Sequence, residues 1–318
     1  MSNRNLTTTS LFISMLYLSL IANVFAVQNI DKKLSISNDI QFKINVQRGD
    51  VAIQTWDKNE VSVSGTLDEL SEGFVFEQQG NTLNFEDKMP RHYNSSTNTS
   101  SQLTIKVPKT VKLSADTVSA NLQLTDVKGE LKLSTVSGNI NANQLSGNTE
   151  LHTISGDITT TAINGNNKLK TVSGTIQDTD SQGEINYYLV SGDLNSQSRA
   201  EKVTIEQVSG EVTANLNAAK EIILKTVSGD VQVSLTKNVS IANLDSISGD
   251  IMLTFADIPD ASFDLNGGPS GKISNALTQD EPKKQKYAPR AKLVFQTGSG
   301  AAKVKINTIS GELTLKKR

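Results

Sequence analysis

The sequence predicts an all-β protein with a single domain, a β-solenoid built from coils of about 18 residues. The first observation is a serine that recurs every 18 residues, in most cases within a Val/Ile-Ser-Gly triplet. The series consists of Ser119, Ser137, Ser155, Ser173, Ser191 and Ser209, and Ser228 and Ser248 extend it at steps of 19 and 20. A fixed period of this size is typical of stacked repeats and not of an enzyme-like globule.

The second observation is that each period divides into two halves of nine residues. Steps of nine from Val118 meet an apolar residue at nine of eleven positions, and steps of nine from Ala120 meet glycine at nine of eleven. Because glycine makes up only about 7% of average sequences, chance does not explain this series. The interval indicates two structural units in each coil.

The third observation, an alternation of apolar and polar residues, shows what each unit is. Leu131 and Leu133 flank Lys132, and similar apolar pairs recur in most of the units. Such alternation is typical of a strand with one buried face, and glycine lets the chain bend between strands. We therefore expect each coil to consist of two short strands of about nine residues, with a rise of about 4.8 Å per coil. The repeating residues are expected to face inward and the varying ones outward.

The chain begins with a predicted secretory signal peptide, residues 1–26. Arg4 precedes an apolar stretch from Leu11 to Ala26, and Val24-Phe25-Ala26 suits a cleavage site. The apolar stretch of about 16 residues is shorter than the roughly 20 that span a membrane. We expect cleavage after Ala26 and export of residues 27–318; an uncleaved N-terminal anchor is the alternative.

Residues 27–113 are predicted to form the strands of an N-terminal β cap. Phe42 and Ile44 alternate with polar residues, and the segment holds the only tryptophan, Trp56. The open end of a solenoid exposes unpaired strand edges, so a capping element is expected there. A run of Asn, Ser and Thr from Asn94 to Ser101 predicts a polar loop.

Regular coils are expected over residues 114–256, followed by an irregular loop and final coils over 257–318. Four prolines fall between 257 and 292, and Ile309-Ser310-Gly311 repeats the triplet near the end. The terminal Lys316-Lys317-Arg318 is expected to guard an exposed strand edge with positive charge. A basic stretch within this segment contains Lys283, Lys284, Lys286, Arg290 and Lys292. It could bind an anionic surface; the alternative is an ordinary solvated loop.

The composition excludes several classes of protein. Lys and Arg total 31 and Asp and Glu 33, so no electrostatic attraction to nucleic acid is expected. The chain has no cysteine, which excludes a disulfide framework and a thiolate metal site. No segment after residue 26 is apolar enough to span a membrane. We therefore expect a periplasmic, cell-surface or extracellular protein without a transmembrane span once the signal peptide is removed.

Several motifs resemble a known family. They are the strand pattern from Phe42 to Val63, Ile105-Lys106-Val107-Pro108, the serial Thr-Val-Ser-Gly and Ser-Gly-Asp motifs, and Thr308-Ile309-Ser310-Gly311. Together they resemble the bacterial putative-adhesin domain, a family of unknown function, over roughly residues 40–316. The resemblance implies a β-solenoid protein of the cell envelope or surface, and it carries no catalytic residue to this chain.

Acidic residues follow many of the Ser-Gly pairs and form one candidate site. If neighbouring coils place carboxylates about 4.8 Å apart, each adjacent pair repels by about 0.9 kcal/mol even in water. A divalent cation would relieve this repulsion, and oxygen ligands suit calcium. The alternative is that these are ordinary solvated turn residues. The weak metal candidates are Asp157, Asp193, Glu211, Asp230 and Asp250.

No catalytic or cofactor-binding residue is predicted. Only His92 and His152 are available as bases, and neither lies near a nucleophile elbow, so the serines are expected to satisfy backbone groups at the bends. A polysaccharide lyase or hydrolase needs carboxylates or basic groups, usually beside aromatic platforms. The coils offer Tyr187 and Tyr188 for that purpose, and this enzyme class remains a lesser alternative.

The sequence thus favours a non-catalytic exported protein that binds or adheres through a repetitive β-surface, with an envelope protein or a glycan as the expected partner. Specificity should lie on the outward faces or in the 257–292 loop. A periplasmic structural or signalling partner protein is the main alternative, and a calcium-binding repeat protein is a further one.

Overall fold

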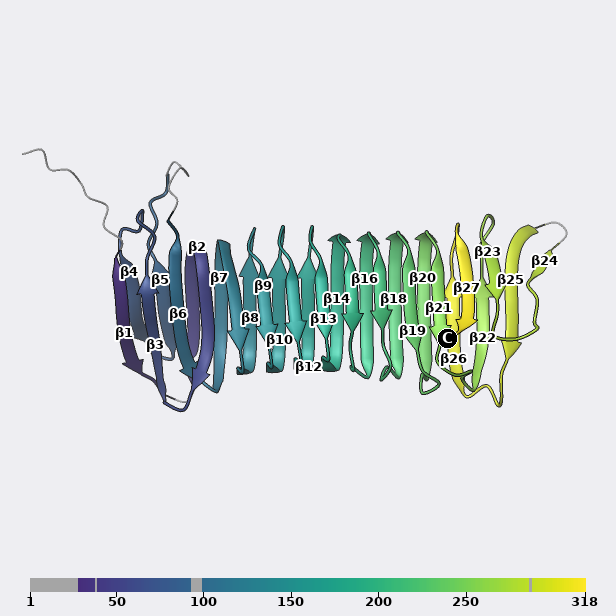
Figure 1. The fold of residues 1–318 in the computed structure, drawn as a ribbon, viewed down its shortest axis with the longest axis horizontal. Coiled ribbons are helices and arrows are strands. Elements are labelled where there is room, and N and C mark those ends of the chain that lie inside the picture. The colour runs from purple at the N-terminus through teal and green to yellow at the C-terminus, as the bar shows by residue number, and fades with distance from the viewer. Residues whose placement is uncertain (1–27, 38, 93–98, 286–287) are drawn as a thin grey trace, which may run out of the picture.

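The protein is an elongated stack of β-coils. The computed structural model describes residues 28–37, 39–92, 99–285 and 288–318, which form 27 strands and no helix. Figure 1 shows the strands side by side along one long axis. The predicted all-β solenoid is confirmed. The predicted signal peptide, residues 1–26, lies outside the described residues, and among these no helix is long and apolar enough to cross a membrane.

The regular coils have two faces of unequal strand length. The long-strand face is built from strands of eight to ten residues, and the short-strand face from strands of four or five. The long-strand face contains β8 (Lys128–Thr135), β10 (Ser146–Thr153), β12 (Asn164–Thr171), β14 (Gln182–Ser191), β16 (Lys202–Ser209), β18 (Glu221–Ser228) and β20 (Ile241–Ser248). The short-strand face contains β9 (Ile140–Asn143), β11 (Ile158–Thr161), β13 (Ile176–Thr179), β15 (Leu194–Gln197), β17 (Val212–Asn215), β19 (Val231–Leu235) and β21 (Ile251–Phe255).

Each strand pairs in parallel with its equivalent one coil away. Ser146 lies opposite Asn164, which gives the predicted offset of 18 residues; the offset grows to 19 at Lys202 and Glu221. The two strands of a coil are unequal, contrary to the expected pair of about nine residues each, because the Val-Ser-Gly bend takes four residues, such as 136–139, from one half of the repeat.

The interior is narrow and aliphatic. Leu, Ile and Val side chains from both faces meet inside the coils, and the exposure of most of these side chains does not exceed 3%. At the Val-Ser-Gly bends the buried threonine just before the triplet supports the backbone: Thr153 Oγ1 donates to the Gly138 carbonyl at 3.1 Å, and Thr171 Oγ1 to that of Gly156 at 3.3 Å. The threonine of the Thr-Val-Ser-Gly motif thus performs, inside the coil, the role expected of the serine.

The N-terminal end is interleaved. Strand β2 (Gln41–Trp56) makes a full coil, and it lies between β7 (Thr110–Thr125) on one side and the later pair β5 (Thr82–Asp87) and β6 (Ser101–Pro108) on the other. The chain therefore builds one coil, moves outward to build another, and then passes back over the first. The predicted cap range 27–113 contains both of these coils.

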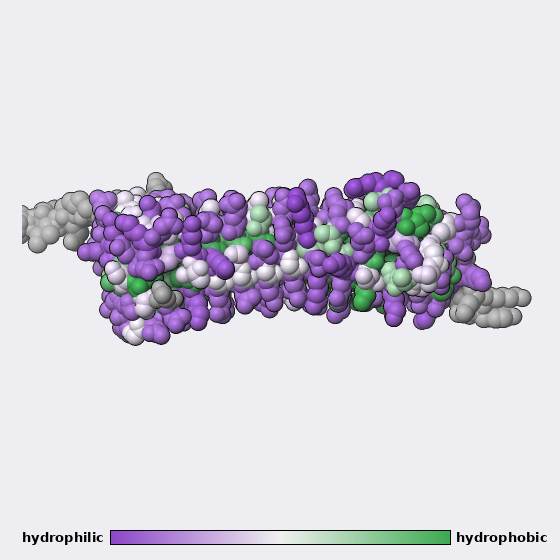
Figure 2. All heavy atoms as spheres, turned by 90° about the horizontal axis from the view of Figure 1, so that it is seen from below, coloured by the Kyte–Doolittle hydropathy of each residue, from purple (hydrophilic) through white to green (hydrophobic). Residues whose placement is uncertain are grey.

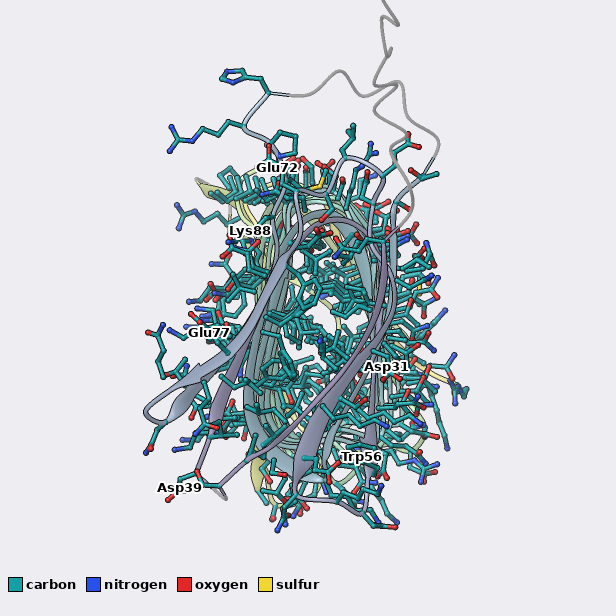
Figure 3. All side chains as sticks on the ribbon, turned by 90° about the vertical axis from the view of Figure 1, so that its left-hand side faces the viewer. Asp31, Asp39, Trp56, Glu72, Glu77 and Lys88 are labelled. Carbon is teal, nitrogen blue, oxygen red and sulfur yellow. The ribbon has the colours of Figure 1, made fainter. Side chains whose placement is uncertain are left out.

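Antiparallel strands close this end. β1 (Asn29–Ser35) pairs with β3 (Glu60–Thr66), which pairs with β6, while β4 (Phe74–Gln79) pairs with β5. Figure 3, viewed along the axis from this end, shows Asp31 of β1 and Glu77 of β4 on opposite sides of the stack, with side chains filling the space between the faces.

The C-terminal end is interleaved in the same way. The last strands, β26 (Ala302–Asn307) and β27 (Glu312–Lys317), lie between β20 and β21 on one side and the earlier β22 (Ala261–Asn266) and β23 (Lys272–Asn275) on the other (Figure 1). Antiparallel β25 (Ala288–Gln296) and β24 (Lys283–Gln285) follow outward from β22. β27 has a neighbour on both sides over residues 313–315, whereas Lys316 and Lys317 pair with β21 alone, so the expectation that Lys316-Lys317-Arg318 guards an exposed edge stays a prediction.

Candidate functional site

The acidic residues after the Ser-Gly pairs lie in one row along the Val-Ser-Gly edge, and the aspartates among them accept hydrogen bonds from backbone groups, whereas Glu211 takes part through its backbone N–H. Asp157 Oδ1 accepts a hydrogen bond of 2.8 Å from the Thr175 backbone N–H, one coil further on. Asp193 does the same for Glu211, at 2.8 Å, and Asp230 for Asp250, at 3.0 Å. Each such bond satisfies an N–H at a bend that would otherwise depend on water.

Asparagine performs the same task in the same row, which shows that the oxygen matters more than the charge. Asn139 Oδ1 accepts the Asp157 N–H at 2.9 Å, and Asn121 Oδ1 accepts the Asn139 N–H at 3.0 Å. At the far end Asp250 Oδ1 accepts the Glu312 N–H at 2.7 Å. No group of three or more His, Cys, Asp or Glu in the described part of the chain is placed to hold a metal ion.

We expect Asp157→Ala to lower the free energy of unfolding by about 1 kcal/mol, because the Thr175 N–H loses its acceptor. Asp157→Asn should leave stability within about 0.5 kcal/mol, because the amide oxygen can take the same bond. Urea denaturation followed by circular dichroism measures both. Calcium titration provides the control: a rise in melting temperature with calcium that Asp157→Asn abolishes would show that the carboxylate row holds a cation.

The residue before each Ser-Gly points outward, contrary to the expectation that repeating residues face inward. These aliphatic side chains form a continuous row along the edge, here called the aliphatic ridge, and are 38–55% exposed. The ridge consists of Val118, Val136, Ile154, Val172, Val190, Val208, Val227, Ile247 and Ile309. The equivalent residues at the opposite edge, such as Val127 and Leu145, are only 1% exposed. The two edges therefore differ in chemistry although their sequences repeat alike.

The remaining surface is mainly polar. Figure 2 shows the side seen from below as largely hydrophilic, with a narrow band of neutral and hydrophobic residues along the long axis. Outward positions of the long-strand face change from coil to coil, as in the series Lys132, Glu150, Lys168, Asn186 and Thr204.

One place on the long-strand face is hollowed. A depression of about 270 Å³ is lined by His152, Lys170, Tyr188 and Glu206 together with Val172 and Val190 of the ridge, over Thr171 and Leu189. A larger hollow of about 420 Å³ lies beside Trp56. There the indole Nε1–H already donates to the Glu60 carbonyl at 2.8 Å, and Lys58 lies 5.1 Å from the ring centre.

The two tyrosines singled out in the sequence face opposite ways. Tyr188 is outward and half-buried, whereas Tyr187 is fully buried and is bonded to Asp178 Oδ2 at 2.7 Å and to Ser196 Oγ at 2.9 Å. Asp178 also accepts hydrogen bonds from Thr160, at 2.5 Å, and from Ser181. This buried polar cluster was not foreseen, because Asp178 and Ser181 occupy positions where other coils place apolar or small residues.

We expect Tyr187→Phe to lower the free energy of unfolding by about 1.5–3 kcal/mol, because Asp178 loses a donor in a buried site. The neighbouring Tyr188→Phe is the matched control and should change stability by less than about 0.5 kcal/mol. Denaturation with urea measures both, and equal losses would show that the buried hydroxyl has no special role.

Burial raises the pKa of Asp178, outweighing the hydrogen bonds from Ser181, Thr160 and Tyr187 that lower it. A carboxyl with a raised pKa in the folded state binds more protons there than in the unfolded chain, so folding gains stability as the pH falls through that raised pKa toward the ordinary value. We therefore expect the wild-type protein to gain stability relative to Asp178→Asn between pH 7 and about pH 4. Unfolding measured at both pH values tests this, and a constant difference would contradict it.

Both histidines lie on the surface. His152 lies in β10 on the outer surface of the long-strand face, and His92 is exposed beside the undescribed residues 93–98. The stacked serines are exposed at the bends and bond to one another or to backbone, as Ser191 Oγ does with Ser209 Oγ at 3.1 Å. No hydrogen bond between a serine and either histidine is formed among the described residues.

The filled interior, the parallel register of coils and the interleaved ends define a β-solenoid repeat protein. A family model for Toastrack DUF4097 matches residues 40–223 and 195–316. The chain belongs to this family of unknown function, and the resemblance drawn from its motifs is confirmed.

Three solved structures illustrate the likeness. A putative adhesin from Parabacteroides distasonis is 12% identical, with a TM-score of 0.40 and 92% of this chain and 97% of that chain covered. A putative adhesin from Parabacteroides merdae is 17% identical, with a TM-score of 0.34 and coverage of 72% and 89%. A putative lipid binding protein from Parabacteroides distasonis is 16% identical, with a TM-score of 0.36 and coverage of 91% and 97%. No curated protein matches the chain.

Proposed function

We propose that this chain is a non-catalytic exported protein of the cell envelope or surface that binds a partner through the outward side of its coils. The observation that carries the proposal is the contrast between a repeated interior and a varied polar exterior. Inward positions hold the same aliphatic residues from coil to coil, as in Leu133, Leu151 and Leu169, whereas their outward neighbours change charge and size. A surface that varies on a constant scaffold is suited to recognition.

The regular coils offer little backbone for recognition, because the strands are paired on both sides along the stack. Addition of a partner strand to a sheet edge, a common way to bind peptides, is therefore not open to the central coils. The two capped ends have antiparallel strands outside the stack. A partner that binds to the regular coils must therefore contact their side chains.

Surface labelling on intact cells tests the location. A membrane-impermeant amine reagent should biotinylate exposed lysines such as Lys132 and Lys305 on intact cells of the source organism, and N-terminal sequencing should find residue 27 as the first residue. Labelling only after the outer membrane is permeabilised would contradict surface display and favour a periplasmic partner protein. A cytoplasmic marker protein that stays unlabelled is the control.

Incubation of the purified protein with acidic and neutral glycans tests the absence of catalysis. We expect binding without new chain ends. Release of reducing or unsaturated ends, abolished by substitution of exposed acids or bases on the coils, would show an enzyme of the polysaccharide lyase or hydrolase class.

A further inference from the structure

The depression beside Tyr188 is the place on the coils where aromatic, cationic and aliphatic groups meet. Tyr188 is the only aromatic side chain that faces outward from coils 110–256, since Tyr187 and Phe255 are buried. An aromatic ring has a large apolar face with low conformational freedom, which makes it a good contact surface for a ligand. This ring is half-buried and does not belong to the core.

Four successive coils supply one column of side chains to the depression. His152 of β10 lies opposite Lys170 of β12, Lys170 opposite Tyr188 of β14, and Tyr188 opposite Glu206 of β16. Neighbouring members are therefore separated by about 4.8 Å along the axis. The column runs parallel to the aliphatic ridge, whose Val172 and Val190 form the other wall. The result is a shallow trough with one apolar and one polar side.

The trough lies beside an excess of positive charge. Lys132, Lys168 and Lys170 surround the single acid Glu150, and Lys170 Nζ donates to Glu150 Oε1 at 2.8 Å. That hydrogen bond raises the pKa of Lys170, and the adjacent Lys170 ammonium lowers the pKa of Lys168. Three ammonium groups around one carboxylate give this cluster a net positive charge. An anion placed there would relieve the repulsion between the lysines.

Lys168 also contacts the tyrosine ring. Its Nζ lies 5.3 Å from the centre of the Tyr188 ring, within the range of a cation–π contact, and Lys168 does not line the depression. At the other end of the trough Glu206 lies 3.6 Å from Lys225, which balances its charge. The trough therefore has a cationic end at Lys170 and an acceptor end at Glu206, with the ring between them.

We propose that this trough binds an acidic sugar residue of a glycan, which rests on the proposed function as a binding protein. The apolar C–H face of the sugar packs on Tyr188 and on Val172 and Val190, its carboxylate meets Lys170, and its hydroxyls bond with His152 and Glu206. Charge-assisted hydrogen bonds to a carboxylate are the strong contacts in such a site. The trough is open along the axis, so a chain of sugars can continue over the neighbouring coils.

Calorimetric titration of the purified full chain tests the proposal. Oligogalacturonides serve as the acidic probe, and their methyl esters serve as the neutral probe of the same sugar. We expect the acidic probe to bind, the methyl ester to bind at least about tenfold more weakly, and the affinity to fall as salt is raised. Failure of oligogalacturonides and of other uronic-acid and sialic-acid oligosaccharides to bind would overturn the proposal.

Three variants locate the site. Tyr188→Ala and Lys170→Gln should each weaken binding by about tenfold or more, while Lys305→Gln, the same charge change at an exposed position of β26 far along the same face, should leave it within about twofold. Unchanged melting temperatures in all three show that the fold is intact. Binding that survives Tyr188→Ala, or an equal affinity for poly-glutamate, would overturn the assignment of an acidic sugar to this trough.

The test of the trough and the test of the proposed function can fail independently of each other. If the protein is labelled on intact cells and still adheres to a surface with Tyr188→Ala, the trough is not the binding site although the protein is a surface binder. If the trough binds acidic glycans but the protein is labelled only in permeabilised cells, the trough is assigned correctly and surface display is wrong.

Discussion

Replacement of Gly165 by alanine is expected to lower the free energy of unfolding by roughly 4 kcal/mol or more, the range reached when the backbone itself must move. Gly165 has φ of +130°, and a Cβ added there would lie 2.0 Å from the carbonyl oxygen of Gly147 in the neighbouring coil. Coils in parallel register cannot separate at one residue without losing hydrogen bonds on both sides. Urea denaturation gives the overall loss, and hydrogen exchange over residues 146–191 should show local opening.

Gly73→Ala is the matched control for this prediction. Gly73 has a similar φ of +122°, but a Cβ there would meet no atom within 4 Å. Gly73→Ala therefore introduces the conformational strain of a positive φ, about 1–3 kcal/mol, without a steric clash of the added Cβ. Equal losses for the two variants would show that strain alone, and not the contact between coils, makes glycine necessary at Gly165.

Replacement of Arg48 by methionine is expected to lower the free energy of unfolding by about 3–5 kcal/mol, the cost of leaving a buried charge without its partner. Arg48 of β2 donates through Nη2 to Asp68 Oδ1 at 3.0 Å and to the Thr99 carbonyl at 2.8 Å. The Asp68 side chain is 0% exposed. A second buried acid, Asp87, lies close by, and burial raises its pKa. The pair thus fixes the returning loop of the N-terminal end.

Lys109→Met provides the comparison for the buried ion pair. Lys109 Nζ lies 3.4 Å from Asp57 Oδ1, but the two side chains are 64% and 89% exposed. Such surface pairs contribute at most about 1 kcal/mol. Denaturation curves for both variants measure the difference. If the loss in Arg48→Met is no larger than in Lys109→Met, the buried pair does not stabilise the end of the stack.

The sequence was a good guide to the coils because each coil contacts only its neighbours. A residue of β12 meets the residues 18 positions before and after it, so the contacts that decide its place recur at a fixed interval and leave a period in the sequence. The chemistry of the acidic row was also partly visible, since Asn139 alternates with Asp157 and both offer the same acceptor oxygen.

The candidate trough was much less visible. Tyr188 and His152 are 36 residues apart and follow no motif; they share a column only because the register places equivalent residues of β10, β12 and β14 in line. The aliphatic ridge was misplaced because the two half-repeats have the same pattern. Val136 and Leu145 occupy equivalent positions in the sequence, and only the unequal bends turn one outward and the other inward.

The class of fold, the length of the coil and the family could be derived from the residues alone, because these depend on interactions that repeat with a fixed spacing. The folded structure was needed to establish the order of the coils at the two ends, where β2 and β26–β27 are inserted between strands distant in the chain. It also decided which repeated residues are exposed and which varying ones meet at Tyr188. These features depend on pairing between single segments, which occurs once and leaves no period to be found.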